Sequence, residues 1–232
     1  MSLSIGIVGL PNVGKSTLFN ALTDSQILAA NYPFATIEPN TAIAPVPDPR
    51  LQKLEALYGA KKVIPATVTF VDIAGLVAGA SQGEGLGNQF LSHIRSCNAI
   101  IQVVRAFEDP NVLRSDSSKD PAYDIDIINT ELVLADLQTV EKRVPKLEKE
   151  ARANPKIKPL ADILGQMKQH LENGAPLWRS SELLAAYHEH LSDLQLLTAK
   201  PVLYVFNLDE NELQDTAKQA TLAQGVAPAP SL

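Results

Sequence analysis

Residues 9–17 read GLPNVGKST and match the pattern G-x-x-x-x-G-K-[ST], in which each fixed residue has a task in holding phosphate. The two glycines permit backbone angles that turn successive N–H groups inward around an anion, and the start of the following helix adds partial positive charge. Lys15 can reach the outer phosphates of a nucleotide, and the Ser16 hydroxyl can bind Mg²⁺. The pattern therefore predicts a site for a nucleoside triphosphate. The residues predicted to contact the nucleotide in this loop are Asn12, Val13, Gly14, Lys15, Ser16 and Thr17.

Two later segments carry oxygen ligands that suit the metal ion of such a nucleotide. Thr36 lies in a proline-containing loop after the first predicted helix and offers Mg²⁺ a second hydroxyl, although a purely structural threonine is the alternative. Asp72 follows a β-branched stretch at residues 66–71, and a carboxylate at such a strand end can hold Mg²⁺ through water. The predicted metal ligands are therefore Ser16, Thr36 and Asp72, the last through water.

Gly75 completes a D-x-x-G motif with Asp72 and bears on hydrolysis. Its backbone N–H is expected close to the γ-phosphate, where a side chain would obstruct, so Gly75 and Lys15 are predicted to be catalytic. Leu76 occupies the next position, at which Ras-type enzymes carry a glutamine that orients the attacking water. Because leucine cannot polarise water, the sequence predicts slow intrinsic hydrolysis. The glycine-dense stretch 79–88 is predicted to be a second switch loop, ordered by the γ-phosphate.

Alternating strands and helices can bring these residues to one edge of a sheet. Such alternation is typical of an α/β fold with a mostly parallel sheet, here that of a P-loop NTPase similar to a G domain. Ligands of these folds bind beyond the carboxyl ends of the strands, which is where all the motifs fall. Buried strands are predicted at 4–8, 66–71, 99–105 and 201–206, and helices at 16–22, 49–57 and 89–95.

A long helical region interrupts this alternation. From residue 125 to residue 198, apolar residues recur at helical spacing with charges between them, and breaks fall near Asn154 and Gly174. We interpret the region as a helical hairpin or short coiled coil inserted into the nucleotide-binding domain. Ordinary flanking helices are the alternative, because the heptads are imperfect. The predicted domains are 1–124 and 199–232 for the two parts of the nucleotide-binding domain, and 125–198 for the insertion.

Composition argues against several other classes of protein. The 232 residues carry a net charge of −6, so a generally basic surface and a sequence-specific nucleic-acid partner are not expected. The one cysteine, Cys97, excludes an intrachain disulfide, and its apolar neighbours predict a core position. No apolar run is long enough to span a membrane, and the sequence does not begin with a signal peptide. A cytoplasmic protein without a membrane partner is expected.

The order of the motifs resembles one family of P-loop proteins. The phosphate loop, Thr36 within YPFATIEPN, the stretch DIAGLV from Asp72, GASQGEGLGNQFL at 79–91 and the segment 207–210 together resemble the Obg-like ATPase (YchF) subfamily of the Obg-type translation-factor GTPases. The resemblance spans essentially the whole chain. It implies a nucleotide domain interrupted by a helical coiled-coil domain, hydrolysis of ATP in preference to GTP, and association with the ribosome through its large subunit.

The resemblance also implies segments beyond this chain, namely a further nucleotide-contacting loop and a small β-rich TGS domain. Residues 225–232 (GVAPAPSL) are predicted to be disordered or to mark an artificial end, so a fragment or a truncated product is expected. Without the further segments, both nucleotide affinity and ribosome binding are expected to be impaired.

Residues 207–210 (NLDE) stand where GTPases of this class carry N-K-x-D, whose aspartate accepts hydrogen bonds from guanine. Glu210 replaces that aspartate and moves the carboxylate by a methylene, while Leu208 replaces the lysine with an apolar contact that suits either purine. Adenine offers an amino donor to Asn207 or to a backbone carbonyl, and a buried carboxylate without donors costs about 1–3 kcal/mol. The predicted base contacts are Asn207, Leu208 and Glu210, and ATP is predicted over GTP. The alternative is that Asp209 serves guanine from a shifted register.

Arg114 is the third residue predicted to be catalytic. Members of the family carry a histidine a few residues after the strand, in the stretch that corresponds to 107–114, and Arg114 stands at the matching position. An arginine cannot act as a base, but it can neutralise charge in the transition state. A surface arginine without a catalytic role is the alternative. A slow ATPase, a GTPase and a nucleotide-dependent binding module with negligible turnover therefore stay open as functions.

Overall fold

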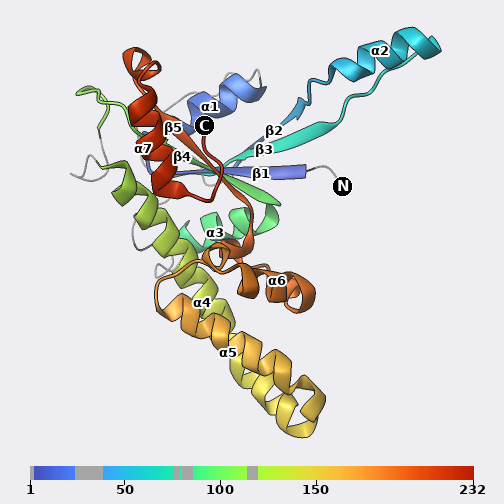
Figure 1. The fold of residues 1–232 in the computed structure, drawn as a ribbon, viewed down its shortest axis with the longest axis vertical. Coiled ribbons are helices and arrows are strands. Elements are labelled where there is room, and N and C mark those ends of the chain that lie inside the picture. Colours follow the sequence, from blue (N-terminus) through green and yellow to red (C-terminus); the bar gives the residue numbers. More distant parts are fainter. Residues whose placement is uncertain (1–2, 24–38, 76–78, 80–85, 114–119) are drawn as a thin grey trace.

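The computed structural model describes residues 3–23, 39–75, 79, 86–113 and 120–232 (Figure 1). Its centre is a five-stranded sheet in the order β2-β3-β1-β4-β5. Strands β1, β3, β4 and β5 run parallel, and β2 pairs antiparallel with β3, so the predicted mostly parallel α/β sheet is confirmed. The strands are Leu3–Val8 (β1), Asn40–Pro45 (β2), Thr67–Asp72 (β3), Ala99–Arg105 (β4) and Val202–Asn207 (β5).

The register of the parallel strands brings the predicted site residues to one edge of the sheet. Ile7 is paired with Asp72 on one side and with Ile101 on the other, and Arg105 is paired with Asn207. The carboxyl ends of the four parallel strands therefore lie together. The phosphate loop, the D-x-x-G motif and the NLDE segment follow these ends, where open α/β sheets bind their ligands.

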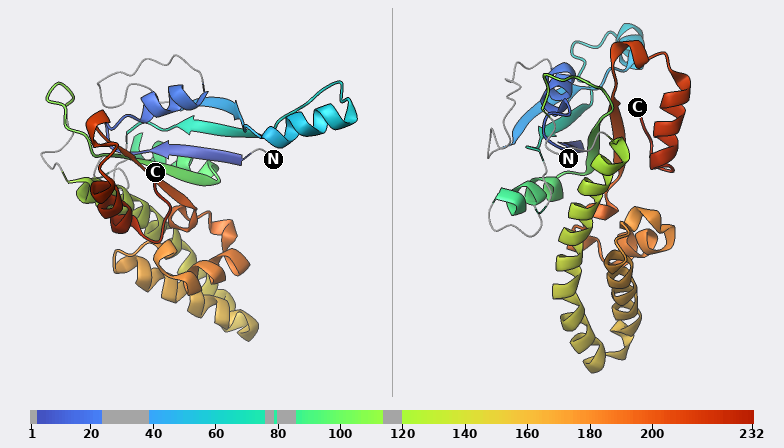
Figure 2. Two further views of the ribbon diagram at one scale, coloured as in Figure 1. Left: turned by 45° about the horizontal axis from the view of Figure 1, so that its top comes forward. Right: turned by 90° about the vertical axis from the view of Figure 1, so that its left-hand side faces the viewer.

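Helices cover both faces of the sheet (Figure 2). The helix α1 (Lys15–Thr23) lies over one face, and α3 (Leu86–Ser96) lies with the first half of α4 (Pro121–Ala153) over the other. In β4 every residue from Ile100 to Arg105 is buried, because helices cover both faces of the sheet there. The core of the sheet includes the buried side chains of Ile7, Val8, Phe19, Ile94, Cys97, Ile100, Val103, Ile128 and Leu132. Cys97 therefore has the predicted core position.

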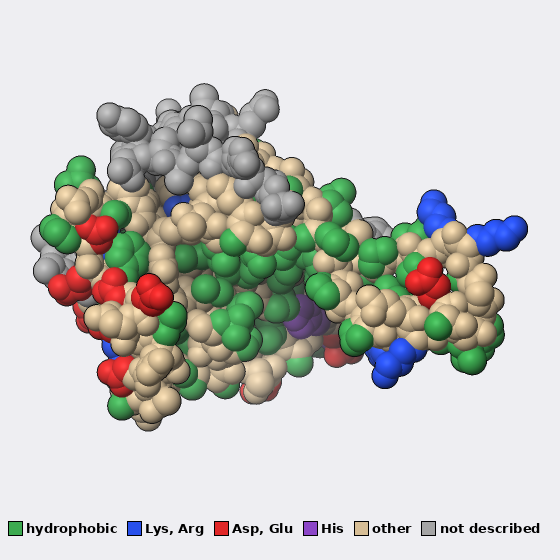
Figure 3. Space-filling view, turned by 90° about the horizontal axis from the view of Figure 1, so that it is seen from above, with side chains coloured by type: hydrophobic (Ala, Val, Ile, Leu, Met, Phe, Trp, Pro, Cys, Tyr) green, Lys and Arg blue, Asp and Glu red, His purple; other side chains and the backbone are tan. Residues whose placement is uncertain are grey.

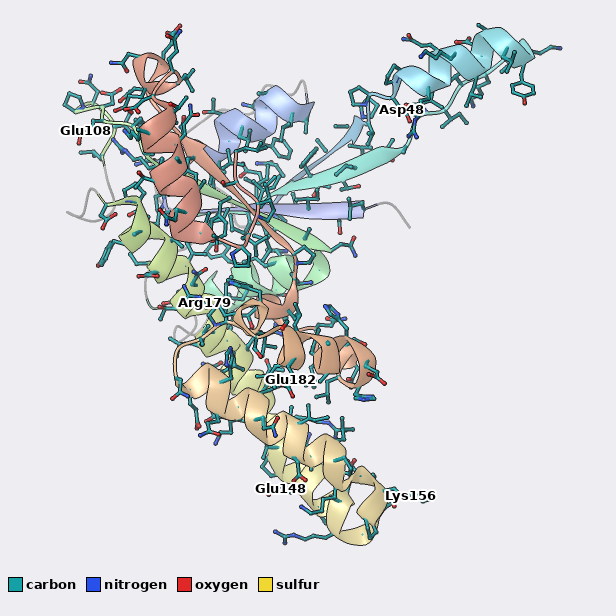
Figure 4. All side chains as sticks on the ribbon, in the orientation of Figure 1. Asp48, Glu108, Glu148, Lys156, Arg179 and Glu182 are labelled. Atoms are coloured by element: carbon teal, nitrogen blue, oxygen red, sulfur yellow. The ribbon has the colours of Figure 1, made fainter. Side chains whose placement is uncertain are left out.

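The second half of α4 leaves the sheet as one side of a helical arm (Figure 1). After the short turn η1 (Pro155–Ile157), α5 (Lys158–Glu172) returns antiparallel against α4. Figure 4 labels Glu148 and Lys156 near the far end of this arm. Within the described ranges, no helix combines the length and the apolar character needed to cross a membrane. The seam of the arm is filled by Val140, Leu147, Leu164, Met167 and Leu171, which are all buried.

The helix α4 is continuous between the sheet and the arm. It begins at Pro121, slightly before the predicted boundary, because Asp120 caps its first turn by accepting the N–H of Ala122. Ile128 belongs to the core of the sheet, whereas Val140 of the same helix belongs to the core of the arm. The division into a nucleotide-binding domain and a separate insertion therefore stays a prediction.

The chain returns from the arm to β5 through short helices. Asp136 of α4 fixes this return, since its fully buried carboxylate accepts the N–H groups of Leu197 at 2.8 Å and Thr198 at 2.7 Å. Burial raises the pKa of Asp136 to about 6, although these two N–H groups and the guanidinium of Arg95 oppose the change. The helices of the return are η2 (Leu177–Arg179), α6 (Ser181–His190), η3 (Ser192–Leu194) and η4 (Leu197–Ala199).

The connection between β2 and β3 projects from the sheet as a tip that carries the helix α2 (Pro49–Tyr58). Lys and Arg side chains lie at the end of this tip (Figure 3). The helix buries none of its residues and is bounded by Asp48, which caps its N-terminus, and by Gly59 in the left-handed region. Asn40, at the start of β2, pairs with Asp72, so the tip lies at the opposite end of the strands from the phosphate loop.

Residues 225–232 are ordered, and the predicted disorder is wrong. After α7 (Thr216–Val226), the chain runs beside β5, where the N–H of Tyr204 donates to the carbonyl of Pro230 at 3.0 Å and the N–H of Leu232 donates to the carbonyl of Tyr204 at 2.9 Å. The outer edge of β5 offers backbone groups that need partners, and this segment satisfies them.

Candidate nucleotide site

The phosphate loop joins β1 to α1, and two glycines in it stand too close to neighbouring atoms for a side chain. A Cβ on Gly9 would lie 2.5 Å from the carbonyl oxygen of Val103, and a Cβ on Gly14 would lie 2.6 Å from Nδ2 of Asn207. Gly14 also has a φ of +102°, which residues with a side chain rarely adopt. The loop therefore needs glycine at both positions to follow this path.

The other residues of the loop differ in exposure and in contacts. Asn12 has a φ of +61°, and its Nδ2 donates to the carbonyl of Leu113 at 2.9 Å. Val13 is buried, whereas Thr17 in the first turn of α1 is exposed. Asn12 thus connects the phosphate loop to the loop after β4, and Val13 anchors it in the core.

Lys15, the first residue of α1, carries a buried ammonium group. Its side chain is 8% exposed, and Nζ donates to the carbonyl oxygen of Leu10 at 2.8 Å, across its own loop. Burial lowers the pKa of Lys15 to about 8, and the nearby carboxylate of Asp72 opposes this change. A phosphate group arriving at the loop would stabilise the charged form of this ammonium.

Ser16 and Asp72 connect the start of α1 to the end of β3. The Ser16 hydroxyl donates to Oδ2 of Asp72 at 2.8 Å. Burial raises the pKa of the Asp72 carboxyl, while the Ser16 hydroxyl and the Lys15 ammonium oppose that change. A hydroxyl beside a carboxylate is a pair of hard oxygen ligands, which Mg²⁺ takes directly or through water, so the two residues fit this ion. Among the described residues, no group of three or more His, Cys, Asp or Glu side chains offers another metal site.

Gly75 brings the D-x-x-G motif against the phosphate loop. A Cβ at this position would lie 2.9 Å from the backbone nitrogen of Pro11 and 3.0 Å from its Cγ. The N–H of Ile73 donates to the carbonyl of Ile7 at 3.2 Å, so the segment still follows β1 after β3 has ended. Glycine is therefore required for the close approach of the motif to the loop.

Asn207, the last residue of β5, also reaches the phosphate loop. Its Nδ2 donates to the carbonyl of Val13 at 3.1 Å, and its backbone carbonyl accepts the N–H of Ala106 at 2.9 Å. The residue predicted to contact the base thus also braces the loop predicted to hold the phosphates.

The three residues after Asn207 have different surroundings. Leu208 is half-buried, and Glu210 is exposed at the start of η5 (Glu210–Glu212). Oδ2 of Asp209 accepts the backbone N–H of Glu108 at 3.1 Å, in the loop after β4 (Figure 4). This contact directs the Asp209 carboxylate to the protein backbone and weighs against its reading guanine from a shifted register.

Arg105, at the end of β4, is a positioning residue that the motifs do not reveal. It is 3% exposed, and its guanidinium donates to the carbonyl oxygens of Phe107 at 3.4 Å, Asp109 at 3.2 Å and Val112 at 3.0 Å. It also lies 4.3 Å from the centroid of the Phe107 ring. Arg105 thereby shapes the loop that touches Asn12. A charged residue that ends a buried strand is the sequence signal that could have found it.

Two predicted site residues, Thr36 and Arg114, lie outside the described residues, and so does Leu76, which stands in the position of the water-orienting glutamine. Most of the predicted switch loop 79–88 lies outside them as well. The structure does bring three predicted residues from other segments to the phosphate loop, where Lys15 and Ser16 lie. They are Asp72, Gly75 and Asn207.

Comparison with known proteins gives one family. A family model described as "50S ribosome-binding GTPase" matches residues 4–141. A protein of Bacillus subtilis named "Ribosome-binding ATPase YchF" is 50% identical over 225 residues, which cover 97% of this chain and 61% of that protein. A protein of the same name from Escherichia coli O157:H7 is 49% identical over 216 residues, covering 93% and 59% respectively. The chain therefore spans about three fifths of the length of these relatives.

A solved structure shows the same fold. It is titled "Structure of the Schizosaccharomyces pombe YchF GTPase", and it matches with a TM-score of 0.74 at 40% identity. The match covers 100% of this chain and 64% of the other. It therefore includes the helical arm as well as the sheet.

Proposed function

The chain belongs to the 50S ribosome-binding GTPase family, within its YchF group, and from that premise we propose that it is a Mg²⁺-dependent nucleotide switch that hydrolyses ATP in preference to GTP. The observation that carries the proposal is the contact of Ser16 with Asp72 beside the buried Lys15. These residues bring a hydroxyl, a carboxylate and an ammonium group to the loop that a triphosphate and its metal would occupy.

Phosphate binding is proposed to use positive charge and N–H donors that are already present at the loop. Lys15 donates to the neutral carbonyl of Leu10, and a phosphate oxygen would be a stronger, charged acceptor for the same ammonium. The N-terminus of α1 and the N–H groups of the loop from Asn12 to Thr17 add further donors. The expected result is tight binding of the outer phosphates.

Mg²⁺ binding is proposed to involve Ser16 directly and Asp72 through water, with Thr36 as a further hydroxyl ligand. The hydrogen bond of 2.8 Å between Ser16 and Asp72 supports the first two roles, since it brings both oxygens together. When bound, the ion would neutralise part of the charge on the phosphates.

The preference for ATP is proposed from residues 207–210. Asp209 accepts a backbone N–H from Glu108, which directs its carboxylate to the protein backbone. Glu210 replaces the aspartate that accepts hydrogen bonds from guanine and carries its carboxylate one methylene further out. Asn207, Leu208 and Glu210 are the proposed base contacts. The relatives from Bacillus subtilis and Escherichia coli are named ATPases, whereas the Schizosaccharomyces pombe protein is titled a GTPase. A GTPase is therefore the second candidate.

Hydrolysis is proposed to be slow. The N–H of Gly75, the ammonium of Lys15 and the guanidinium of Arg114 would stabilise charge on the γ-phosphate, but Leu76 cannot orient the attacking water. A binding module with negligible turnover is the rival. Single-turnover release of phosphate from ATP is expected to be faster for the wild type than for Lys15→Ala. Equal rates in the two proteins would support the binding module with negligible turnover.

The ribosome, through its large subunit, is the proposed partner, because relatives are named ribosome-binding and the family model carries the same description. A cytoplasmic location is proposed with it. Co-sedimentation with ribosomal subunits in the presence of an ATP analogue or ADP tests this partner. Binding that depends on the nucleotide is expected, and no co-sedimentation in either state would count against it.

A further inference from the structure

Glu131 on α4 is a buried carboxylate that the proposed chemistry of the site does not use. Its side chain is 4% exposed, and Oε1 accepts the backbone N–H of Gly79 at 2.6 Å across a sequence separation of 52 residues. A hydrogen bond from an amide to a carboxylate is short and stronger than a bond between neutral groups. Because a buried carboxylate needs such donors, the positions of Gly79 and α4 are linked.

Gly79 belongs to the segment that starts at the D-x-x-G motif. Gly75 lies against Pro11 of the phosphate loop, where a Cβ would come within 2.9 Å of the Pro11 nitrogen. Four peptide units join Gly75 to Gly79, and they span at most about 14 Å. One end of this short segment is therefore held at the phosphate loop and the other end is held by Glu131.

The same helix also holds the entry to β5. Asp136 accepts the N–H groups of Leu197 and Thr198, and β5 then leads to Asn207, which donates to the carbonyl of Val13. Hydrogen bonds thus connect α4 to two segments that end at the phosphate loop. The far half of α4 forms the arm (Figure 1).

We propose that Glu131 is a positioning residue that makes α4, and with it the arm, sensitive to the terminal phosphate of the nucleotide. Glu131 holds Gly79 before the nucleotide arrives, four residues from Gly75, so Gly75 can meet a γ-phosphate at a smaller entropic cost. By linkage, a triphosphate that binds Gly75 also favours the arrangement in which Glu131 holds Gly79. The inference rests on the proposed function, because it takes Gly75 as a donor to the γ-phosphate.

The test is titration of the 232-residue chain with a non-hydrolysable ATP analogue and with ADP, each with Mg²⁺. Glu131→Ala is expected to lower the affinity for the analogue about tenfold and the affinity for ADP less than about twofold. Glu131→Gln keeps an oxygen acceptor without the charge and is expected to lower the affinity for the analogue about threefold. Glu141→Ala is the matched control, since Glu141 lies on the same helix with a half-exposed side chain beside Lys168.

The losses of affinity for the ATP analogue and for ADP distinguish the proposed role of Glu131 from a merely structural contact. A merely structural contact would weaken both nucleotides equally, so an equal loss, or unchanged affinity for the analogue, overturns the inference. Glu131→Gln keeps the test decisive if Glu131→Ala does not fold. A wild-type chain that does not bind the analogue would overturn the proposed function itself, and the inference with it.

Discussion

The side-chain amide nitrogen of Asn207 lies 2.6 Å from the position that a Cβ on Gly14 would take, and it donates to the carbonyl of Val13 at 3.1 Å. The two ends of this hydrogen bond are 194 residues apart in the sequence. It joins the end of β5 to the phosphate loop, so the segment expected to contact the base and the loop expected to hold the phosphates share one contact.

Replacing Asn207 is therefore expected to weaken binding of the whole nucleotide and not only the contacts to its base. In Asn207→Ala the Val13 carbonyl loses its donor, which costs about 1 kcal/mol and allows the loop to relax. We expect the affinities for ATP and ADP to fall alike, each by roughly five- to tenfold. Titration of both nucleotides checks this, with Asn173→Ala at the exposed end of α5 as the control. An unchanged affinity would contradict a bracing role.

Removing the Ser16 hydroxyl or the charge of the Asp72 carboxylate should abolish most of the gain in nucleotide affinity that Mg²⁺ gives. Wild type is expected to bind a triphosphate at least about tenfold more tightly with Mg²⁺ than with EDTA, and Ser16→Ala or Asp72→Asn is expected to lose most of that gain. Thr221→Ala on α7 is the matched control, because its hydroxyl donates within its own helix, to the carbonyl of Ala217. A full Mg²⁺ effect in the variants would rule out these ligands.

Lys15 should make the stability of the nucleotide-free protein depend on pH. Its pKa is about 8 in the fold and 10.5 in the unfolded chain, so the unfolded chain binds more protons between these values and stability rises with pH there. Below pH 8 the penalty of burying the charged ammonium is complete. Relative to Lys15→Met, the wild type should gain on the order of 3 kcal/mol between pH 8 and 10.5, as measured by urea unfolding. Parallel pH profiles of the two proteins would contradict the buried ammonium.

Arg105 should matter for stability although no motif contains it. Arg105→Met leaves three backbone carbonyls without their donor and is expected to lower the free energy of unfolding by about 2–4 kcal/mol. Arg105→Lys keeps the charge but cannot reach all three carbonyls, so an intermediate loss is expected. Urea unfolding measures both, with Arg143→Met as the control, since Arg143 pairs with Glu150 on the partly exposed surface of the arm. Equal stability of Arg105→Met and wild type would contradict the role of this residue.

Local patterns were enough to predict most of the fold. The strand at Ala99–Arg105 and the start of α2 at Pro49 fall where the apolar pattern predicts them. The phosphate loop was predictable because its chemistry needs fixed residue types at fixed spacing. The helix α7 was not, because its apolar residues do not form one stripe.

Contacts between distant segments could not be derived from the sequence. The bonds of Glu131 to Gly79, of Asp136 to Leu197 and of Asn207 to Val13 join residues 52, 61 and 194 positions apart. Such pairings depend on the topology of the sheet and not on any local pattern. The order of residues 225–232 has the same origin, since it depends on the edge of β5 beside them.

Competition between ATP and GTP for the purified chain, with Mg²⁺ present, tests the central claim most directly. We predict that ATP displaces GTP and binds at least about tenfold more tightly, because Asp209 accepts the backbone N–H of Glu108 and Glu210 carries its carboxylate one methylene further than the aspartate that it replaces. Asp209→Ala is expected to keep that order. Tighter binding of GTP by the wild type, lost in Asp209→Ala, would show that Asp209 reads guanine and would contradict the account.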